Sequence, residues 1–200
     1  MRPTEIRIYY EGSKALKPGF DRFFDELKSK ARNCRCQFAL ISGGPGSETC
    51  RDFATALKTH EDAWNILLVD SEGPDNLRLS DALCERQGWA KSRSGSIFWM
   101  VEMMESWFHS DKDALEIFYG SQFNQKSLKP NPKVEEIPKA DLVEGLRNAT
   151  RACPKGYFEN KASHGGKILE LLDPDRVRRA APKCKKLFDA ISISLSYPPA

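Results

Sequence analysis

Short apolar runs alternate with longer amphipathic stretches along the first seventy residues of the chain. Three of the runs are rich in β-branched and aromatic residues, as strands are, and they read EIRIYYEG, CQFALISGG and AWNILLVD. Between them, apolar residues recur at helical spacing. This predicts a helix over about 18–31 and a second helix in GSETCRDFATALKTH, with Ser47 as its N-cap. Strands that alternate with helices of this length predict βαβ units and a parallel sheet.

The pattern changes after the third run. Residues 72–96 are polar and predict a long loop with a short helix near 79–86. The apolar segment SIFWMVEMMESWFHSD predicts a short fourth strand at about 96–100. We expect this strand to run into a helix that carries Glu102 and Glu105 on one face.

The rest of the chain is predicted to be helical. Asp111 is the expected N-cap of a helix in DKDALEIFYG, and a linker rich in Pro and Asn follows. Further helices are expected near 139–150, 161–172 and 174–194. The predicted architecture is α/β, with four or so parallel strands flanked by helices. We expect residues 1–125 to form this domain and residues 126–200 to form a basic helical C-terminal lobe packed on it.

The composition is that of an ordinary globular protein. Hydrophobic residues make up 40% and charged residues 30% of the chain. The apolar runs are too short to span a bilayer, and the start MRPTEIRIYYEG lacks the apolar segment of a signal peptide. We therefore expect a cytoplasmic protein without membrane contact. The six cysteines are scattered and are expected to be reduced thiols: Cys34, Cys36, Cys50, Cys84, Cys153 and Cys184.

Positive charge is concentrated near the C-terminus. The net charge is only +3, but the segment from Lys155 to Lys186 carries nine Lys and Arg residues against four acids. Such a segment is able to face phosphates. The alternative is a solvated helix face, and charge alone favours that alternative.

Three carboxylates stand where predicted strands end. Glu11 closes the first strand, Asp70 closes the third, and Glu72 follows two residues later on the same side of an extended chain. If these strands are neighbours, the three acids converge and repel one another unless a cation lies between them. Their oxygen ligands suit Mg²⁺ or Mn²⁺, and the absence of Cys and His argues against zinc. The alternative is an acidic strand end that caps a helix or faces water.

The chain resembles the Toprim domain, and within it proteins related to OLD-type nucleases. An acid–Gly turn after the first strand and an acid–x–acid pair after the third carry the resemblance, in YYEG and LLVDSEGP. More closely, the chain resembles a bacterial family often encoded beside an AAA-type ATPase in phage-defence loci. The matching pieces of that resemblance are ISGG before a helix with RDF, MMESWFHSD, VEEIPKAD and HGGKILELLDPDRV.

The resemblance implies roles for particular residues. Glu11 would bind the metal or act as general acid and base, Asp70 and Glu72 would be metal ligands, and Glu105 would complete a second metal site. The Toprim pair is commonly Asp-x-Asp, so Glu72 departs from the pattern. Three residues of the basic segment are expected to hold the scissile phosphate: Lys161, His164 and Lys167. A passive, exposed histidine is the alternative for His164.

Glycines precede the second helix in SGGPGSET. No Gly-Lys-Ser/Thr follows, so the segment is not a Walker A nucleotide site. Gly43 and Gly44 allow close backbone approach, and the helix N-terminus, helped by Arg51, is able to bind an anion such as a substrate phosphate. A tight turn between strand and helix explains the glycines equally well.

The resemblance, together with the three carboxylates, implies an Mg²⁺- or Mn²⁺-dependent nuclease in antiphage defence. Its substrate would be DNA or RNA, including tRNA, and an AAA- or ABC-type ATPase would be its partner. One alternative is a catalytically degenerate binding subunit of an ATPase complex. Another is a phosphoryl-transfer enzyme that acts on a nucleotide or small molecule, which the modest net charge suits.

Overall fold

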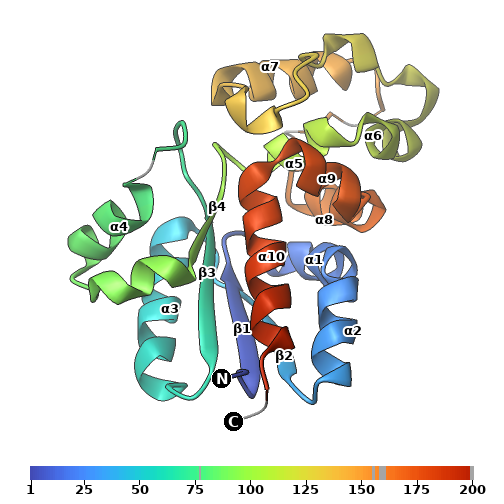
Figure 1. Cartoon of the computed structure of the whole chain (residues 1–200). Helices are drawn as coiled ribbons and strands as arrows, with labels where there is room; N and C mark the ends of the chain where they lie inside the picture. The colour runs from blue at the N-terminus through green and yellow to red at the C-terminus, as the bar shows by residue number, and fades with distance from the viewer. Residues whose placement is uncertain (77, 155, 158–160, 199–200) are drawn as a thin grey trace.

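A four-stranded, fully parallel sheet forms the centre of the protein in the computed structural model (Figure 1). The structure describes all residues except 77, 155, 158–160 and 199–200. The strands are β1 (Glu5–Tyr10), β2 (Gln37–Ser42), β3 (Trp64–Asp70) and β4 (Ile97–Met100), in the spatial order β2-β1-β3-β4. The prediction of an α/β fold with a parallel sheet flanked by helices is confirmed.

The order of the strands brings the ends of β1 and β3 together. Tyr10 pairs with Leu68, and the next residue, Glu11, donates its backbone N–H to the carbonyl of Leu68 at 2.9 Å. The carboxyl end of β1 therefore lies directly beside Asp70, the last residue of β3. Chain segments that leave a parallel sheet at this edge are the usual positions of functional groups.

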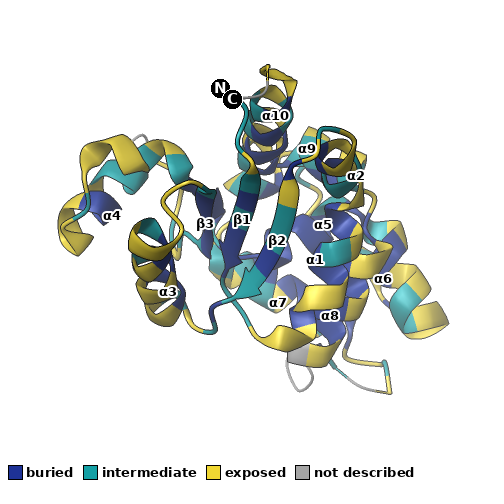
Figure 2. Ribbon diagram, turned by 90° about the horizontal axis from the view of Figure 1, so that it is seen from below, coloured by how far each residue is buried: buried dark blue, intermediate teal, exposed yellow. Residues whose placement is uncertain are grey.

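One face of the sheet is covered by α3 (Gly46–Thr59) and α4 (Leu79–Gln87). Phe53 of α3 packs on this face, where Tyr9, Leu67 and Val69 are also buried. The outer side of α3 is exposed, as the yellow surface of this helix in Figure 2 shows. Strand β3 is buried from Asn65 to Val69 because helices cover both of its faces.

The opposite face is covered by α1 (Lys17–Phe23), α2 (Asp25–Asn33) and α10 (Pro182–Ser196). Its aromatic residues pack closely: the ring centroid of Phe23 lies 5.1 Å from Trp107 and 5.6 Å from Phe188. One hydrophobic core therefore joins residues on both sides of the expected domain division at residue 125. That division stays a prediction.

The remaining helices gather at the carboxyl edge of the sheet, with α5, α6 and α7 above the strands in Figure 1. They are α5 (Glu105–Ser110), α6 (Lys112–Tyr119), α7 (Lys139–Ala149), α8 (Lys161–Leu171) and α9 (Pro174–Ala180). Short 3₁₀ helices span Lys14–Leu16, Lys91–Ser96, Gly120–Gln122, Gln125–Ser127 and Val134–Glu136.

Helix α8 docks against α1 through glycines. A Cβ atom on Gly19 would lie 2.4 Å from the carbonyl oxygen of Gly166, and one on Gly166 would lie 2.3 Å from that of Ala15. Only residues without a side chain permit this approach of the two backbones. The contact fixes α8, and with it Lys161 at the first residue of the helix, over the carboxyl edge of the sheet.

Two predicted helices are broken in the structure. The helix expected over 18–31 is interrupted at Phe24, whose φ and ψ of −96° and 14° leave the helical region. The helix expected over 174–194 is interrupted at Ala181, because Pro182 has no N–H and starts a new helix at its first position.

Two residues are placed differently from the prediction. Ser47 is not an N-cap, since α3 already begins at Gly46 and its capping residue is Pro45. Glu102 is not helical either, because α5 begins only at Glu105. The N-cap role of Asp111 is confirmed, since its side chain accepts the backbone N–H of Ala114.

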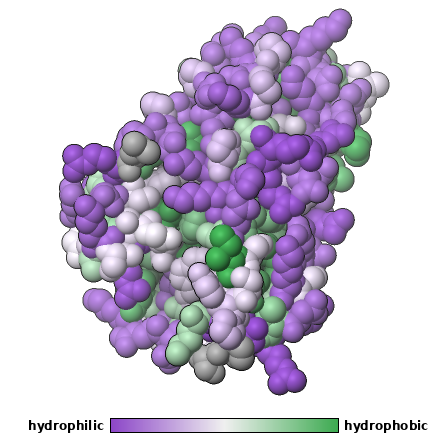
Figure 3. All heavy atoms as spheres, viewed as in Figure 1, coloured by the Kyte–Doolittle hydropathy of each residue, from purple (hydrophilic) through white to green (hydrophobic). Residues whose placement is uncertain are grey.

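The surface in the view of Figure 3 is dominated by hydrophilic residues, with apolar residues in small groups. Large exposed hydrophobic residues are few among those described, and they include Ile117, Ile193 and Tyr197. All six cysteines have free thiols. Within the described ranges, no helix has the length and apolar character needed to cross a membrane.

Candidate metal centre

Glu11, Asp70 and Glu72 converge at the carboxyl edge of the sheet. One oxygen atom of each side chain lies within 4.8 Å of those of the other two. Glu11 follows β1, Asp70 ends the neighbouring β3, and Glu72 lies in the loop after β3. Adjacent parallel strands thus bring Glu11 to Asp70, from which it is 59 residues apart in the sequence.

Backbone donors fix the carboxylate of Glu11. Its Oε1 accepts the N–H of Gly46 at 3.1 Å, and its Oε2 accepts the N–H of Asp70 at 3.1 Å. A Cβ atom at position 46 would lie 2.9 Å from Oε2, so a glycine makes room for the carboxylate at the start of α3. Burial raises the pKa of Glu11, the charge of Glu72 adds to the rise, and the two N–H donors oppose it.

Asp70 is held from the other side of the site. Its Oδ1 accepts the backbone N–H of Met104 at 2.9 Å, which ties the end of β3 to the segment before α5. The pKa of Asp70 is raised well above its ordinary value, first by burial and then by the charges of Glu105 and Glu11. The nearby ammonium group of Lys161 opposes this rise.

Glu105 is fully buried behind Asp70. Its Oε1 accepts a hydrogen bond from the hydroxyl of Tyr157 at 2.7 Å and lies 2.9 Å from the ammonium group of Lys161. Its Oε2 is buried and has no hydrogen-bond partner among the described residues. A buried carboxylate oxygen without a partner is unusual, and here it belongs to a residue whose charge raises the pKa of Asp70.

Glu72 is the exposed member of the group. Its backbone has a φ of +58°, and its N–H donates to the carbonyl of Glu102 at 2.9 Å. Its carboxylate is paired with the ammonium group of Lys139, the first residue of α7, and this pairing raises the pKa of Lys139. The backbone N–H of Lys139 donates to the carboxylate of Glu102 at 2.9 Å, so Glu102 anchors α7 at the site.

The side chains fit a hard divalent cation. All three converging ligands are carboxylate oxygens, and the unpartnered oxygen of Glu105 lies behind them. Mg²⁺ and Mn²⁺ take such ligands and keep open positions for water or a phosphate oxygen. The cluster contains neither Cys nor His, so its chemistry does not suit zinc.

Residues 13–192 match the family described as Domain of unknown function (DUF4276). The chain belongs to this family. No curated protein and no solved structure matches the chain significantly. The match covers β2, β3, β4 and the helices that close over the edge of the sheet, and it includes Asp70, Glu72 and Glu105. Strand β1 and Glu11 lie just before its first residue.

The three basic residues expected to hold a phosphate have different surroundings. Lys161 contacts Glu105 at the site. His164 is buried, and its Nδ1 lies 3.1 Å from the hydroxyl of Tyr119, with Phe118 packed against the ring. Lys167 is exposed and lies about 240° around α8 from Lys161, so the two ammonium groups leave the helix on different sides.

The glycines before α3 form a tight turn. The N–H of Gly43 donates to the carbonyl of Tyr10 at 3.1 Å, and the N–H of Gly44 donates to that of Gly12 at 3.1 Å. Gly44 also needs its left-handed φ of +75°. Because both N–H groups are used inside the fold, neither is available to a substrate phosphate. Arg51 is exposed one turn into α3.

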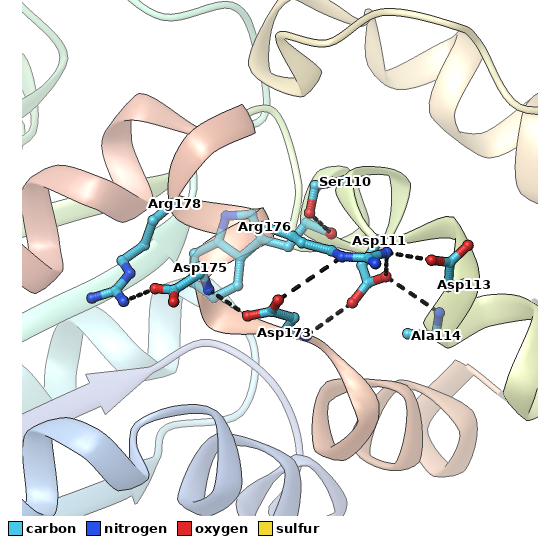
Figure 4. A network of polar contacts seen from close by, with 9 residues as sticks. Ser110, Asp111, Asp113, Ala114, Asp173, Asp175, Arg176 and Arg178 are labelled. Atoms are coloured by element: carbon cyan, nitrogen blue, oxygen red, sulfur yellow. Dashed lines mark hydrogen bonds and ion pairs between the residues drawn. The ribbon is translucent and has the colours of Figure 1, made fainter.

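Much of the basic C-terminal segment is neutralised by acids. The guanidinium group of Arg176 lies 2.9 Å from Asp111, 2.5 Å from Asp113 and 3.9 Å from Asp173 (Figure 4). Four more cations of the segment are in ion pairs: Lys161, Arg178, Lys183 and Lys185. Lys155 lies outside the described residues. Five of the eight described cations between Lys161 and Lys186 are therefore paired with acids.

Tyr157 is a site residue that the sequence did not reveal. It is fully buried, packs against Phe108 and donates its hydroxyl proton to Glu105. It lies 52 residues from its partner in a stretch without helical or strand periodicity, so no local pattern marks it. The pairing of Lys139 with Glu72 spans 67 residues and carries no sequence signal either.

Proposed function

We propose that this protein is a metal-dependent phosphodiesterase, with Mg²⁺ or Mn²⁺ bound by Glu11, Asp70 and Glu72. The observation that carries the proposal is the convergence of these three carboxylates within 4.8 Å at the carboxyl edge of a parallel sheet. The buried, unpartnered oxygen of Glu105 beside them supports it, because a cation would compensate the accumulated negative charge.

In this proposal the carboxylates and Lys161 have different roles. Glu11 and Asp70 are oriented by backbone N–H groups, and their remaining lone pairs would bind the cation. Mg²⁺ or Mn²⁺ held by these carboxylates would supply Lewis acidity for the phosphate and for a water nucleophile. Lys161, which is half-exposed and lies over the acids, adds a positive charge where the negative charge of a phosphate grows during cleavage.

The resemblance to the Toprim group extends this proposal. It suggests a nuclease that cleaves DNA or RNA and takes part in antiphage defence together with an AAA-type ATPase. The position of Glu11 after β1 and of the Asp70-x-Glu72 pair after the adjacent β3 supports that resemblance. The resemblance also suggests a second cation at Glu105, and the effect of the Glu105 charge on the pKa of Asp70 supports its nearness to the first.

A cleavage assay tests the proposal. Wild type, the Glu11→Gln/Asp70→Asn double variant and an Asp52→Asn/Asp189→Asn control would be incubated in Mg²⁺ or Mn²⁺ with plasmid DNA, single-stranded DNA and total tRNA. Asp52 and Asp189 are exposed on α3 and α10, so the control removes the same charge away from the site. We expect wild type and control to cut and the double variant to lose at least 100-fold in rate.

Three other outcomes of the cleavage assay would contradict or change the proposal. If all three proteins cut equally, the acids are not catalytic and the proposal is wrong. If none cuts, with or without an AAA-type ATPase encoded beside the protein, a binding subunit of an ATPase complex replaces the enzyme. If a nucleotide or another small phosphodiester is cleaved and the polynucleotides are not, the enzyme acts on a small substrate.

A further inference from the structure

A basic groove runs along the outer side of α3, and none of the three carboxylates of the candidate metal centre lines it. It has a volume of about 490 Å³ and is bounded by α3 on one side and by the segment after α4 on the other. Figure 2 shows α3 and α4 on the same side of the sheet. The residues that line it include Ser47, Arg51, Lys58, Trp89 and Arg93.

The helix side of the groove is one continuous stripe. Ser47, Arg51, Ala54 and Lys58 follow one another at intervals of four, three and four residues, which places them on one face of α3. Arg51 and Lys58 are seven residues apart, roughly 10 Å along the helix axis. The stripe therefore spaces two positive charges along the direction of the groove.

The groove begins beside the candidate metal centre. Ser47 directly follows Gly46, whose N–H donates to Glu11 at 3.1 Å. Arg51 lies one turn further along α3, and Lys58 lies near the end of the helix at Thr59. A chain bound along the groove would therefore have one end next to the carboxylates.

The charges in the groove are free to meet a ligand. Arg51, Lys58 and Arg93 are exposed, and within the described part of the chain none of them is in an ion pair. The described residues that line the groove include no Asp or Glu. Three uncompensated cations in one groove generate a positive potential that favours a polyanion.

An aromatic ring lies among these cations. Trp89 is partly exposed and lines the groove, and its ring meets Phe53 at a centroid distance of 5.2 Å and an angle of 62°. It directly follows Gly88, whose left-handed φ of +67° turns the chain at the end of α4. Basic side chains combined with an aromatic ring are characteristic of surfaces that bind unpaired nucleic acid strands, whose bases stack on the ring.

We propose that this groove binds a single-stranded nucleic acid and leads it to the carboxylates at Glu11. Arg51, Lys58 and Arg93 contact the phosphates, and Trp89 stacks on a base. The proposal deepens the proposed function and rests on it for the direction of the strand. The phosphate backbone is common to DNA and RNA, so both are included in the test.

The test is a binding measurement without metal, so that cleavage plays no part. Fluorescein-labelled single-stranded DNA and RNA 15-mers, a DNA duplex and poly-glutamate would be titrated in EDTA and followed by fluorescence anisotropy. The groove variant is Arg51→Gln/Arg93→Gln. The matched control is Arg32→Gln/Arg179→Gln, which removes two exposed arginines on α2 and α9 and changes the net charge equally.

We expect the groove variant to bind single strands roughly tenfold more weakly than wild type, and the control to change affinity less than about twofold. The plot of the logarithm of the binding constant against the logarithm of the salt concentration has a negative slope. Its magnitude should decrease by roughly 1.4 for the groove variant, because two phosphate contacts are lost. Trp89→Leu should weaken binding at least about fivefold, while Trp89→Phe keeps a ring and much of the affinity. The tighter of the DNA and RNA arms names the natural substrate.

Four outcomes would overturn the inference. The first two are that wild type binds no nucleic acid, and that the groove variant and the control lose affinity for single strands equally. The other two are that wild type binds the duplex as tightly as single strands, and that it binds poly-glutamate as tightly as nucleic acid with the same dependence on Arg51 and Arg93. Failure of the proposed function looks different. In that case the groove variant loses affinity for single strands as expected, but the cleavage assay fails. Either the Glu11→Gln/Asp70→Asn variant cleaves as fast as wild type, or wild type does not cleave at all.

Discussion

Two basic regions of this protein differ in what their charges contact. The segment from Lys161 to Lys186 contains more cations, yet five of them are in ion pairs with acids. The groove along α3 contains three cations, and none is in an ion pair among the described residues. The number of positive residues in a stretch therefore does not tell which of them meets a phosphate.

The comparison predicts opposite effects of mutations in the two regions. Charges that are paired and partly buried contribute to the stability of the fold, and removing one partner leaves the other without compensation. Charges that are exposed and unpaired contribute little to stability and are available to a ligand. Each of the following experiments measures how the removal of a charged side chain changes the free energy of unfolding.

The largest effect is expected at Asp111. Its side chain is only 5% exposed, accepts the backbone N–H of Asp173 at 2.9 Å and pairs with Arg176. Asp111→Ala removes these contacts and the N-cap of α6, so we expect a loss of about 3 kcal/mol in the free energy of unfolding. Urea denaturation at pH 7 measures it.

The matched control is Asp113→Ala. Asp113 contacts the same guanidinium group, but its side chain is 61% exposed. We expect a loss below about 0.5 kcal/mol, because an exposed ion pair contributes little. Equal losses for the two variants would contradict the structural role of the Asp111 network.

A smaller effect, dependent on pH, is expected at Glu135. Both of its carboxylate oxygens accept the N–H of Lys183 near the start of α10, at 2.9 and 3.1 Å. Burial raises its pKa from 4.5 to about 7; the charge of Asp75 adds to the rise, while the charge of Lys183 and the backbone N–H groups of Lys183 and Cys184 oppose it. The folded protein thus retains a proton on Glu135 that the unfolded chain has released.

The sign of the effect follows from this difference. The contribution of Glu135 to stability is fully present below pH 4.5 and is lost as the pH rises through about 7. Glu135→Gln should make the urea midpoint less dependent on pH between 5 and 8, whereas Glu136→Gln, at an exposed neighbour, should leave the wild-type dependence. If the urea midpoints of wild type and Glu135→Gln depended on pH in the same way, Glu135 would not be the source of the pH dependence.

The smallest stability effect is expected in the groove. Arg51→Gln/Arg93→Gln removes two exposed guanidinium groups that have no ion-pair partner in the described structure, so we expect the free energy of unfolding to change by less than about 0.5 kcal/mol. The same denaturation curve measures it. A loss above about 1 kcal/mol would mean that these arginines are structural, and would remove the distinction between the two regions.

The sequence predicted the structural features that depend on residues close together along the chain. Apolar runs located the strands, and the acids at their ends located the candidate metal centre, because adjacent parallel strands bring equivalent ends together. The helix break at Pro182 was also open to prediction, since a proline cannot continue a helix. The break at Phe24 has no such local cause.

The contacts that complete the site were not predictable in the same way. Tyr157 with Glu105 and Lys139 with Glu72 join residues 52 and 67 positions apart. The groove joins α3 to the turn at Trp89, and it exists only because both elements pack on the same face of the sheet. Such contacts follow from tertiary packing, and a single sequence carries no periodic signal for them.

The most direct test of the account is a calorimetric titration of Mn²⁺ into wild type, Asp70→Asn and the exposed control Asp189→Asn, with thermal melts to verify that all three are folded. We predict that wild type and control bind Mn²⁺ alike, and that Asp70→Asn binds it at least roughly tenfold more weakly, because a carboxylate ligand is lost. Equal binding by all three proteins, or no binding by folded wild type, would contradict the claim that these carboxylates form a metal centre.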